Sequence, residues 1–249
     1  LYPATSETIG SMRGRVFAGQ PVLTNVPPWI QDEVLNDVDR AGQSIYVFLP
    51  RWFEWALTHG HAGVIVDSPE FDGPVTSVEA VERKLHPYLT LVKAPQILGA
   101  VVAEGSLVQL RVQFYEEVTD PDDTWNTITR ETIRVYERSD AGVTVEIFVY
   151  KAETKEYLSS GVKTMGKLKE IPFVVFYTGF QSPFHSIPPL RELAYLNAKH
   201  WHIQSAYDSI CVLAMIPILT LIGGEKDTTL LIGSRAAVKI QNPEGDLKY

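Results

Sequence analysis

Residues 189–216 read PLRELAYLNAKHWHIQSAYDSICVLAMI, and no other part of the chain constrains its fold as strongly. Pro189 stands at a favourable first position of a helix, and Pro217 is expected to end it. Nothing interrupts the helical pattern between them, so it predicts one rod roughly 40 Å long. That is about twice the length of an ordinary globular helix, and it needs an explanation.

This predicted helix has two different faces. Successive residues lie about 100° apart around a helix, which gathers the apolar side chains into one stripe, the expected packing face. A long helix with a second, smooth face either connects domains or stands beside copies of itself; the alternative is a helix crossing an ordinary α+β core. The apolar stripe holds Leu193, Leu196, His200, Ile203, Tyr207, Ile210 and Ala214, and the small polar face holds Arg191, Ala198, His202, Ser205 and Ser209.

Towards the N-terminus the hydrophobic period changes to two. Between Val101 and Lys151 apolar and polar residues alternate, which is typical of strands with one buried face. Turn-rich residues at 120–126 and 139–142 divide this region. It predicts a three-stranded antiparallel meander over residues 108–114, 127–138 and 143–149.

Short helices and apolar strands are expected around the meander. Helices are predicted from Thr5 or Ser6 to Gly19, from Pro28 through Val38, from Ser44 through Leu57 with a kink at Pro50 unless the helix begins close by, and from Ser77 to Leu85. Trp52, Phe53 and Trp55 are interpreted as core residues. Buried strands are predicted at GVIVD (63–67) and IPFVVFY (171–177). The fold class is therefore α+β.

Composition excludes several classes of protein. Of the 249 residues 45% are hydrophobic, enough for a real core, and the formal net charge of −8 includes no basic run, so tight binding of nucleic acid is not expected. The apolar run from Ile210 to Ile222 contains Pro217 and is shorter than the about 20 residues that span a bilayer. The single cysteine, Cys211, is expected to be a buried thiol of a reducing compartment. Because the chain starts at Leu1, we expect a fragment.

Catalytic and metal sites are weakly signalled. The segment from Gly223 to Lys226 lacks the pattern of a phosphate-binding loop. The pairs His59/His61 and His200/His202 are spaced two residues apart, so on a helix they point about 200° apart, and neither has a further ligand at metal-binding spacing. We expect no metal, cofactor or catalytic residue. The alternative from a different class is an α+β hydrolase or nuclease that uses Asp67, at the end of a buried strand, with a histidine.

Six segments in this order resemble the bacteriophage portal family, in particular the siphophage-type and uncharacterised prophage branch. They are GSMRGRVFAGQPV (10–22), WALTHGHAGVIVDSP (55–69), IPFVVFYTG (171–179), PPLRELAYLNAKHWHIQSAYDS (188–209), ILTLIGG (218–224) and AVKIQNPEGDLKY (237–249). The resemblance implies a wing over residues 1–180, a first stem helix over 188–217 and the beginning of the clip, a small β-containing segment, over 218–249. The second stem helix, the tunnel loops and the crown of the family have no counterpart here.

The resemblance also implies a function without catalysis. Portal subunits form a ring, with roughly twelve copies expected, at a vertex of the capsid, after assembly in the host cytoplasm. DNA passes loosely through the ring, and the terminase large subunit, the head-tail adaptor, and capsid and scaffold proteins dock on it. By this carry-over the small polar face of the long helix lines the channel or contacts a neighbouring subunit, and the clip docks the partners through Lys226, Arg235 and Lys239.

Overall fold

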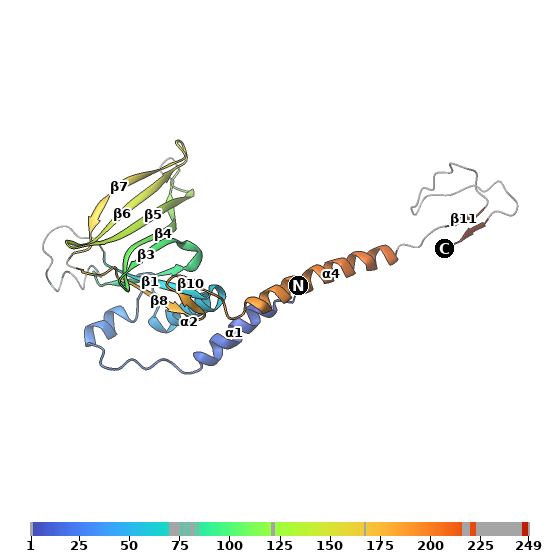
Figure 1. Cartoon of the computed structure of the whole chain (residues 1–249), viewed down its shortest axis with the longest axis horizontal. Helices are drawn as coiled ribbons and strands as arrows, with labels where there is room; N and C mark the ends of the chain where they lie inside the picture. Colours follow the sequence, from blue (N-terminus) through green and yellow to red (C-terminus); the bar gives the residue numbers. More distant parts are fainter. Residues whose placement is uncertain are drawn as a thin grey trace. The chain divides into compact units, whose positions relative to one another are not determined.

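A computed structural model describes residues 2–69, 76, 79, 83, 85–120, 123–166, 168–215, 220–222 and 246–248, the last two segments through their backbone (Figure 1). The chain divides into two compact units, one holding Tyr2–Tyr195 and the other beginning at Leu196. Helices alternate with antiparallel sheets, which confirms the predicted α+β class.

The largest sheet is an antiparallel meander in the order β3-β4-β5-β6-β7. The three predicted strands are present and longer than expected: β4 (Ser106–Thr119), β5 (Thr127–Ser139) and β6 (Gly142–Lys151). The prediction missed the two outer strands, β3 (Ile97–Ala103) and β7 (Glu156–Thr164). All residues of β7 are exposed, so its sequence shows no alternation of buried and exposed positions.

A second, three-stranded sheet has the order β2-β1-β8, and all its pairings are antiparallel. The central strand β1 (His61–Asp67) lies between β2 (Tyr88–Lys93) and β8 (Phe173–Tyr177). These bounds confirm both predicted apolar strands. Because β1 is covered on both faces, its sequence is a continuous apolar run and does not alternate.

The main core lies between these two sheets. Ile65 of β1 and Val92 of β2 pack against the inner face of the meander, where Leu110, Val112 and Tyr136 are at most 1% exposed. The chain passes from one sheet to the other through a 3-10 turn, η2 (Ala94–Gln96), between β2 and β3. Both sheets are therefore joined by one continuous apolar layer.

A helix covers the opposite face of the three-stranded sheet. In α2 (Ile45–His59), Ile45 and Phe48 pack with Val64 of β1 and with Val38, while α1 (Ala4–Val16) lies against α2 through the Arg13–Glu54 ion pair. Pro50 stands inside α2, five residues after its start. The backbone of Ser44 lies at the N-cap position, but its hydroxyl makes no capping hydrogen bond. Trp52, Phe53 and Trp55 are half-buried, so their assignment to the core holds only in part.

The helix predicted from Pro28 through Val38 is reduced to a single π-helical turn, η1 (Ile30–Val34). After it the chain folds into a loop, because the backbone N–H of Val38 bonds the carbonyl of Gln43 at 2.8 Å. Side-chain carboxylates of Asp37 and Asp39 hold the same loop by accepting backbone N–H groups. Val38 is fully buried all the same, so its apolar spacing reflected burial and not helix. The helix predicted from Ser77 to Leu85 lies mostly outside the described residues.

The long helix is one continuous element. It follows a short hairpin of β9 (Phe180–Ser182) and β10 (His185–Ser186) and extends over α4 (Arg191–Met215), 25 residues, as predicted. Beyond it β11 (Thr220–Ile222) pairs antiparallel with β12 (Asp246–Lys248). The rest of the segment expected to form the clip, residues 218–249, lies outside the described residues.

Because the apolar layer between the two sheets is closely packed, a cavity made in it should lower the free energy of unfolding by a large amount. Leu110 is fully buried there, so Leu110→Ala should lower the free energy of unfolding by about 2–5 kcal/mol. Urea denaturation followed by circular dichroism measures the change. Val162→Ala on exposed β7, where Val162 is 63% exposed, is the control and should change stability by less than about 0.5 kcal/mol. Equal effects of the two substitutions would contradict this description of the core.

Candidate functional site

The apolar stripe of α4 is exposed. No described residue of the helix is buried, and Leu196, Ile203, Tyr207 and Ile210 are each about 60% exposed, between 59% and 63%. The expectation that this stripe packs inside the chain is therefore wrong for the single chain. Leu193 is only half-buried. Cys211, expected to be buried, is also half-buried.

The small polar face of α4 is exposed too. Its five members, Arg191, Ala198, His202, Ser205 and Ser209, all reach solvent. Within it the Ser209 hydroxyl donates to the Ser205 carbonyl at 2.9 Å, which leaves a smooth surface. Further large apolar side chains are exposed outside the predicted stripe: Tyr195, Trp201, Val212, Leu213 and Met215. The helix thus presents apolar surface on several sides. The proposed docking residues Lys226, Arg235 and Lys239 lie outside the described residues.

A tight joint, made of Gly60, His61 and Ser186, precedes α4. The Ser186 hydroxyl lies 2.6 Å from Nδ1 of His61, which is 8% exposed, and burial together with the neighbouring His59 and His185 lowers the pKa of His61. Gly60 ends α2 with φ +87°, and a Cβ there would stand 2.6 Å from the Ser186 hydroxyl and 3.0 Å from the nitrogen of Pro188. Only glycine fits this position. The joint holds the backbone at Ser186 and Pro188, shortly before α4 begins at Arg191.

The sequence analysis singled out His59 and His61 for their spacing but did not predict the contact of His61 with Ser186. No group of three metal-binding side chains exists among the described residues. The serine that pairs with His61 is 125 positions away in the sequence, so no local pattern could have revealed it.

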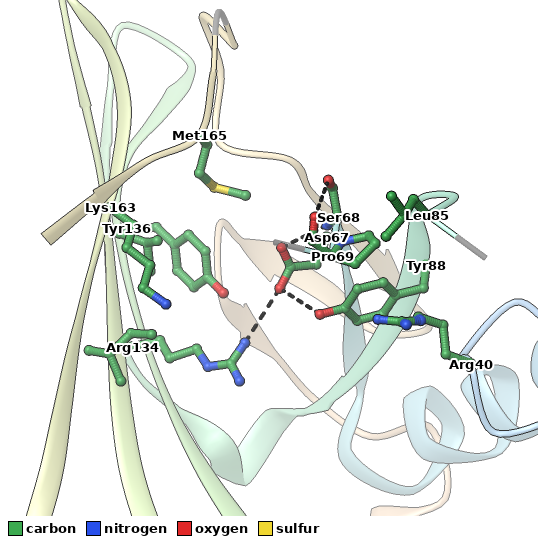
Figure 2. Close-up of a pocket in the computed structure, with 12 residues that line it drawn as sticks. Arg40, Asp67, Ser68, Pro69, Leu85, Tyr88, Arg134, Tyr136, Lys163 and Met165 are labelled. Atoms are coloured by element: carbon green, nitrogen blue, oxygen red, sulfur yellow. Dashed lines mark hydrogen bonds and ion pairs between the residues drawn. The ribbon is translucent and has the colours of Figure 1, made fainter. Parts of the chain in front are cut away.

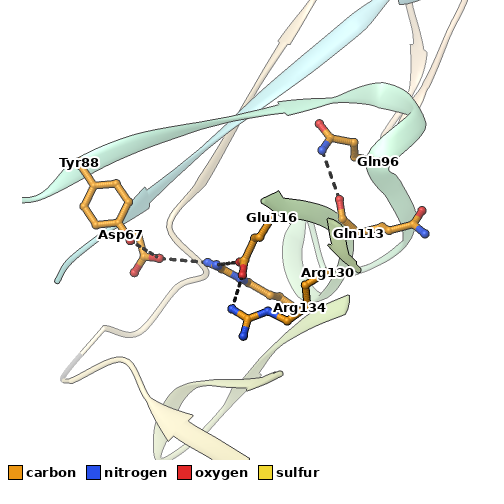
Figure 3. Close-up of polar contacts among 7 residues, drawn as sticks. All are labelled: Asp67, Tyr88, Gln96, Gln113, Glu116, Arg130 and Arg134. Atoms are coloured by element: carbon orange, nitrogen blue, oxygen red, sulfur yellow. Dashed lines mark hydrogen bonds and ion pairs between the residues drawn. The ribbon is translucent and has the colours of Figure 1, made fainter. Parts of the chain in front are cut away.

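The second candidate site surrounds Asp67 at the end of β1. One carboxylate oxygen accepts the backbone N–H of Ser68 at 2.8 Å. The other accepts the Tyr88 hydroxyl at 3.2 Å and faces the Arg134 guanidinium at 3.5 Å (Figure 3). Burial, and next the Asp67 charge, raise the pKa of Tyr88 to about 12. Tyr88 therefore stays a neutral donor to Asp67 at physiological pH.

Arg134 connects this carboxylate to a second one. Its other terminal nitrogen bonds Glu116 at 3.1 Å, and Glu116 also accepts Arg130 at 2.7 Å (Figure 3). Burial alone would raise the pKa of Glu116, but the two arginines outweigh it and the pKa is lowered. Two carboxylates and two guanidinium groups thus form one network that links the three-stranded sheet to the meander.

The network borders a cavity of about 410 Å³. Figure 2 shows Asp67 at its centre, with Tyr88, Arg134 and Tyr136 turned towards it. None of the described residues that line the cavity is a histidine. The alternative prediction, Asp67 acting with a histidine, therefore finds no histidine among the described residues of this cavity, and the Asp67 oxygens are already engaged by three donors.

Comparison with known proteins bears on the C-terminal part of the chain. Residues 189–249, which begin at α4, match a domain of unknown function, DUF4055. No curated protein matches the chain. Within the described residues, no helix is both long enough and apolar enough to cross a membrane.

The lowered pKa of Glu116 predicts how stability depends on pH. A carboxyl whose pKa is depressed by folding stabilises the protein above its unfolded pKa of about 4.3, and this contribution is lost as pH falls through the lower, folded value. We expect the stability of the wild-type protein to fall between pH 5 and the acid limit, and Glu116→Gln to fall less steeply over that interval. Thermal unfolding at a series of pH values measures both slopes.

Glu117→Gln is the matched control, because Glu117 is the next residue on β4 and is exposed. It should keep the wild-type slope. If Glu116→Gln and Glu117→Gln gave the same pH dependence, the network would not stabilise the fold in the way described.

Proposed function

We propose that this chain is a subunit of a bacteriophage portal ring, a DNA conduit without catalytic activity at a capsid vertex. The observation that carries the proposal is the exposure of α4: in 25 residues none is buried, although the helix carries large apolar side chains on several sides. The resemblance of six ordered segments to portal proteins supplies the identity of the assembly.

Exposed apolar surface of this extent calls for a partner. Removing apolar surface from water stabilises a contact by roughly 25 cal/mol per Å², so a helix with several unburied Leu, Ile and Tyr side chains gains much by association. A ring offers each copy two neighbours through one repeated contact. The apolar stripe and the apolar residues flanking it then meet neighbouring subunits, and the small polar face is left for the channel or for close approach.

Charge supports a loose passage of DNA. Each lysine or arginine that grips a phosphate releases counterions and adds affinity, which would slow a moving duplex. The chain has a formal net charge of −8, and the small polar face of α4 holds one arginine, at its first residue. A weakly charged face of this kind can guide DNA without holding it.

The remaining parts of the proposal concern partners. Residues 218–249 would form part of the clip, where Lys226, Arg235 and Lys239 dock the terminase large subunit during packaging and the head-tail adaptor afterwards. Capsid and scaffold proteins would contact the wing, residues 1–180. The proposed location is the virion, after assembly in the host cytoplasm.

Native mass spectrometry of the full-length protein tests the assembly directly. A closed ring of roughly twelve copies is the expected result. A monomer at micromolar concentration in the presence of scaffold protein, or hydrolysis of ATP or DNA by the purified protein, would overturn the proposal.

The exposed stripe predicts that a charge within it affects assembly and not folding. Ile203 is 59% exposed, so Ile203→Asp should leave the melting temperature of the single chain within about 2 °C of wild type while rings disappear from the mass spectrum. Lys199→Asp, on the same helix outside the stripe, is the control and should still form rings. A large drop in melting temperature for Ile203→Asp would mean that the stripe packs inside the chain after all.

The small polar face predicts a steric effect. Ser205→Trp should fold normally, because Ser205 is exposed, but it should block ring closure or the passage of DNA. Ser205→Ala keeps the face small and should behave as wild type. Packaging of DNA into empty capsids measures the difference; normal packaging by Ser205→Trp would remove this face from the channel and from subunit contacts.

A further inference from the structure

The outer face of the meander carries a cluster of tyrosines beside one carboxylate. Side chains alternate between the two faces of a sheet, and Val112 and Phe114 of β4 point into the core. Tyr115 therefore lies on the opposite, outer face, where it is 59% exposed and stands directly across from Glu131 of β5. The cavity beside Asp67 borders the inner face of the same sheet, so the two sites are separate.

Two more tyrosines extend this cluster across the sheet. Tyr150 of β6 pairs with Tyr157 of β7, and the centres of their rings lie 5.2 Å apart. The Tyr157 hydroxyl donates a hydrogen bond to Oε1 of Glu131. This bond is the main cause that raises the pKa of Tyr157 to about 12, and the nearby Tyr115 and Tyr150 add to it. Tyr157 is therefore a neutral donor at physiological pH, and three phenol rings gather beside one carboxylate.

The Glu131 carboxylate has only neutral partners in the described part of the chain. Its Oε1 accepts the Tyr157 hydroxyl and the side-chain amide of Gln113. Among the described residues no lysine or arginine forms an ion pair with Glu131, whereas two arginines pair with Glu116 on the inner face of the sheet. The second oxygen of Glu131, Oε2, makes no hydrogen bond within the same residues. A cation at Oε2 would supply the missing charge.

The surroundings of this carboxylate suit a cation that carries carbon. An ammonium group is attracted to the face of a tyrosine ring, and the attraction strengthens where water is excluded. The next row of the sheet adds apolar surface, because Ile133 and Phe148 pair across β5 and β6 and are half-buried on the same face. A bare metal ion would leave the rings and this apolar row uncovered.

The charge of the outer face disfavours anionic ligands. Aromatic rings on an antiparallel sheet can also stack on the bases of RNA, but the phosphates then require basic side chains nearby. From β4 to β7, alternation gives the described outer face four glutamates and a single arginine: Glu117, Glu131, Glu137, Glu146 and Arg111. Such a face repels phosphates and carboxylates and attracts cations.

We propose that this face binds a small organic ammonium ion, whose charged head lies beside Oε2 of Glu131 and against the rings of Tyr115, Tyr150 and Tyr157. The site lies within the unit Tyr2–Tyr195 and uses no residue of α4, so it does not depend on the proposed portal function. Because the face is open to solvent, we expect a dissociation constant on the order of 1 mM.

Ligand-observed NMR titration of the purified full chain tests the site with two matched probes. Choline carries a quaternary ammonium head. Its neutral isostere 3,3-dimethylbutan-1-ol has the same shape and a carbon atom in place of the charged nitrogen. We expect saturable binding of choline, at least about tenfold tighter than that of the isostere, because only the charged head is attracted to the rings and to Glu131.

A pair of charge substitutions places the binding at Glu131. Glu131→Gln should weaken the binding of choline at least about fivefold, because it removes the charge beside the head. Glu137→Gln is the matched control: Glu137 lies on the same strand and face and likewise accepts a side-chain amide, that of Gln109, but no described tyrosine bonds it. Its affinity for choline should stay within about twofold of wild type.

A pair of ring substitutions separates the attraction of the ring from apolar contact. Tyr115→Phe keeps the aromatic face and should bind choline within about twofold of wild type, whereas Tyr115→Leu removes it and should weaken binding about fivefold. Tyr115 is exposed, so neither change is expected to disturb the fold, and circular dichroism checks each variant.

The inference is overturned if choline shows no saturable binding, if the neutral isostere binds as tightly as choline, or if Glu131→Gln and Glu137→Gln have equal affinities. Equal binding by Tyr115→Phe and Tyr115→Leu would also contradict it. Ile203→Asp, which is expected to form no rings, should bind choline as wild type does. Failure of the proposed assembly and failure of this site can thus be told apart.

Discussion

The long helix α4 keeps its apolar side chains exposed, and this exposure is the constraint on which its role depends. Leu196, Ile203 and Ile210 lie on one side of a 25-residue helix, and each is about 60% exposed. Isolated helices are marginal in water, because most helical stability in proteins comes from packing an apolar face. In the proposed ring, a helix of this length would gain stability from contacts with neighbouring subunits, and the small residues on its other side would permit a neighbour to come close.

The unit Tyr2–Tyr195 does not share this dependence. Its two sheets bury their facing apolar sides against each other, and α2 forms a third layer on the other face of the three-stranded sheet. At the rim of that core Arg134 joins Asp67 of one sheet to Glu116 of the other. Replacing one member of such a partly buried network leaves a charge without its partner, which costs more than the pair contributes. The network therefore specifies how the two sheets face one another, and the same geometry creates the cavity beside it.

Much of this fold could be predicted from the sequence. Where one face of a helix or strand is covered, the spacing of its apolar residues matches the positions that are buried. The meander core followed from that rule, the two apolar strands followed from their continuous apolar runs, and the continuity of α4 followed from a helical pattern that no proline interrupts between Pro189 and Pro217. The rule failed for β7, which is exposed. It also failed for Val38, which fitted the apolar spacing of a helix but is buried in a loop. It could not find the joint of His61 with Ser186 or the network of Arg134, because those partners are far apart in sequence. The stripe of α4 was recognised, but periodicity alone cannot say whether such a stripe is covered by other parts of the same chain.

The net charge of the chain limits which surfaces of α4 could touch one another in the proposed ring. Each chain carries a formal net charge of −8, so copies in the proposed ring would repel one another and would repel DNA. At physiological ionic strength this repulsion is screened beyond about 8 Å, while close contacts still feel it. In the proposed ring, the surfaces that touch would therefore need to be nearly free of charge. Residues 193–215 of α4 meet that requirement, since they contain only Lys199 and Asp208 as charged residues besides two histidines, and Gln204 already engages Asp208 at 2.8 Å. In the proposed portal ring, the acidic character of the chain and the apolar character of its long helix would thus be complementary: the first would keep DNA moving, and the second would let like-charged subunits stay together.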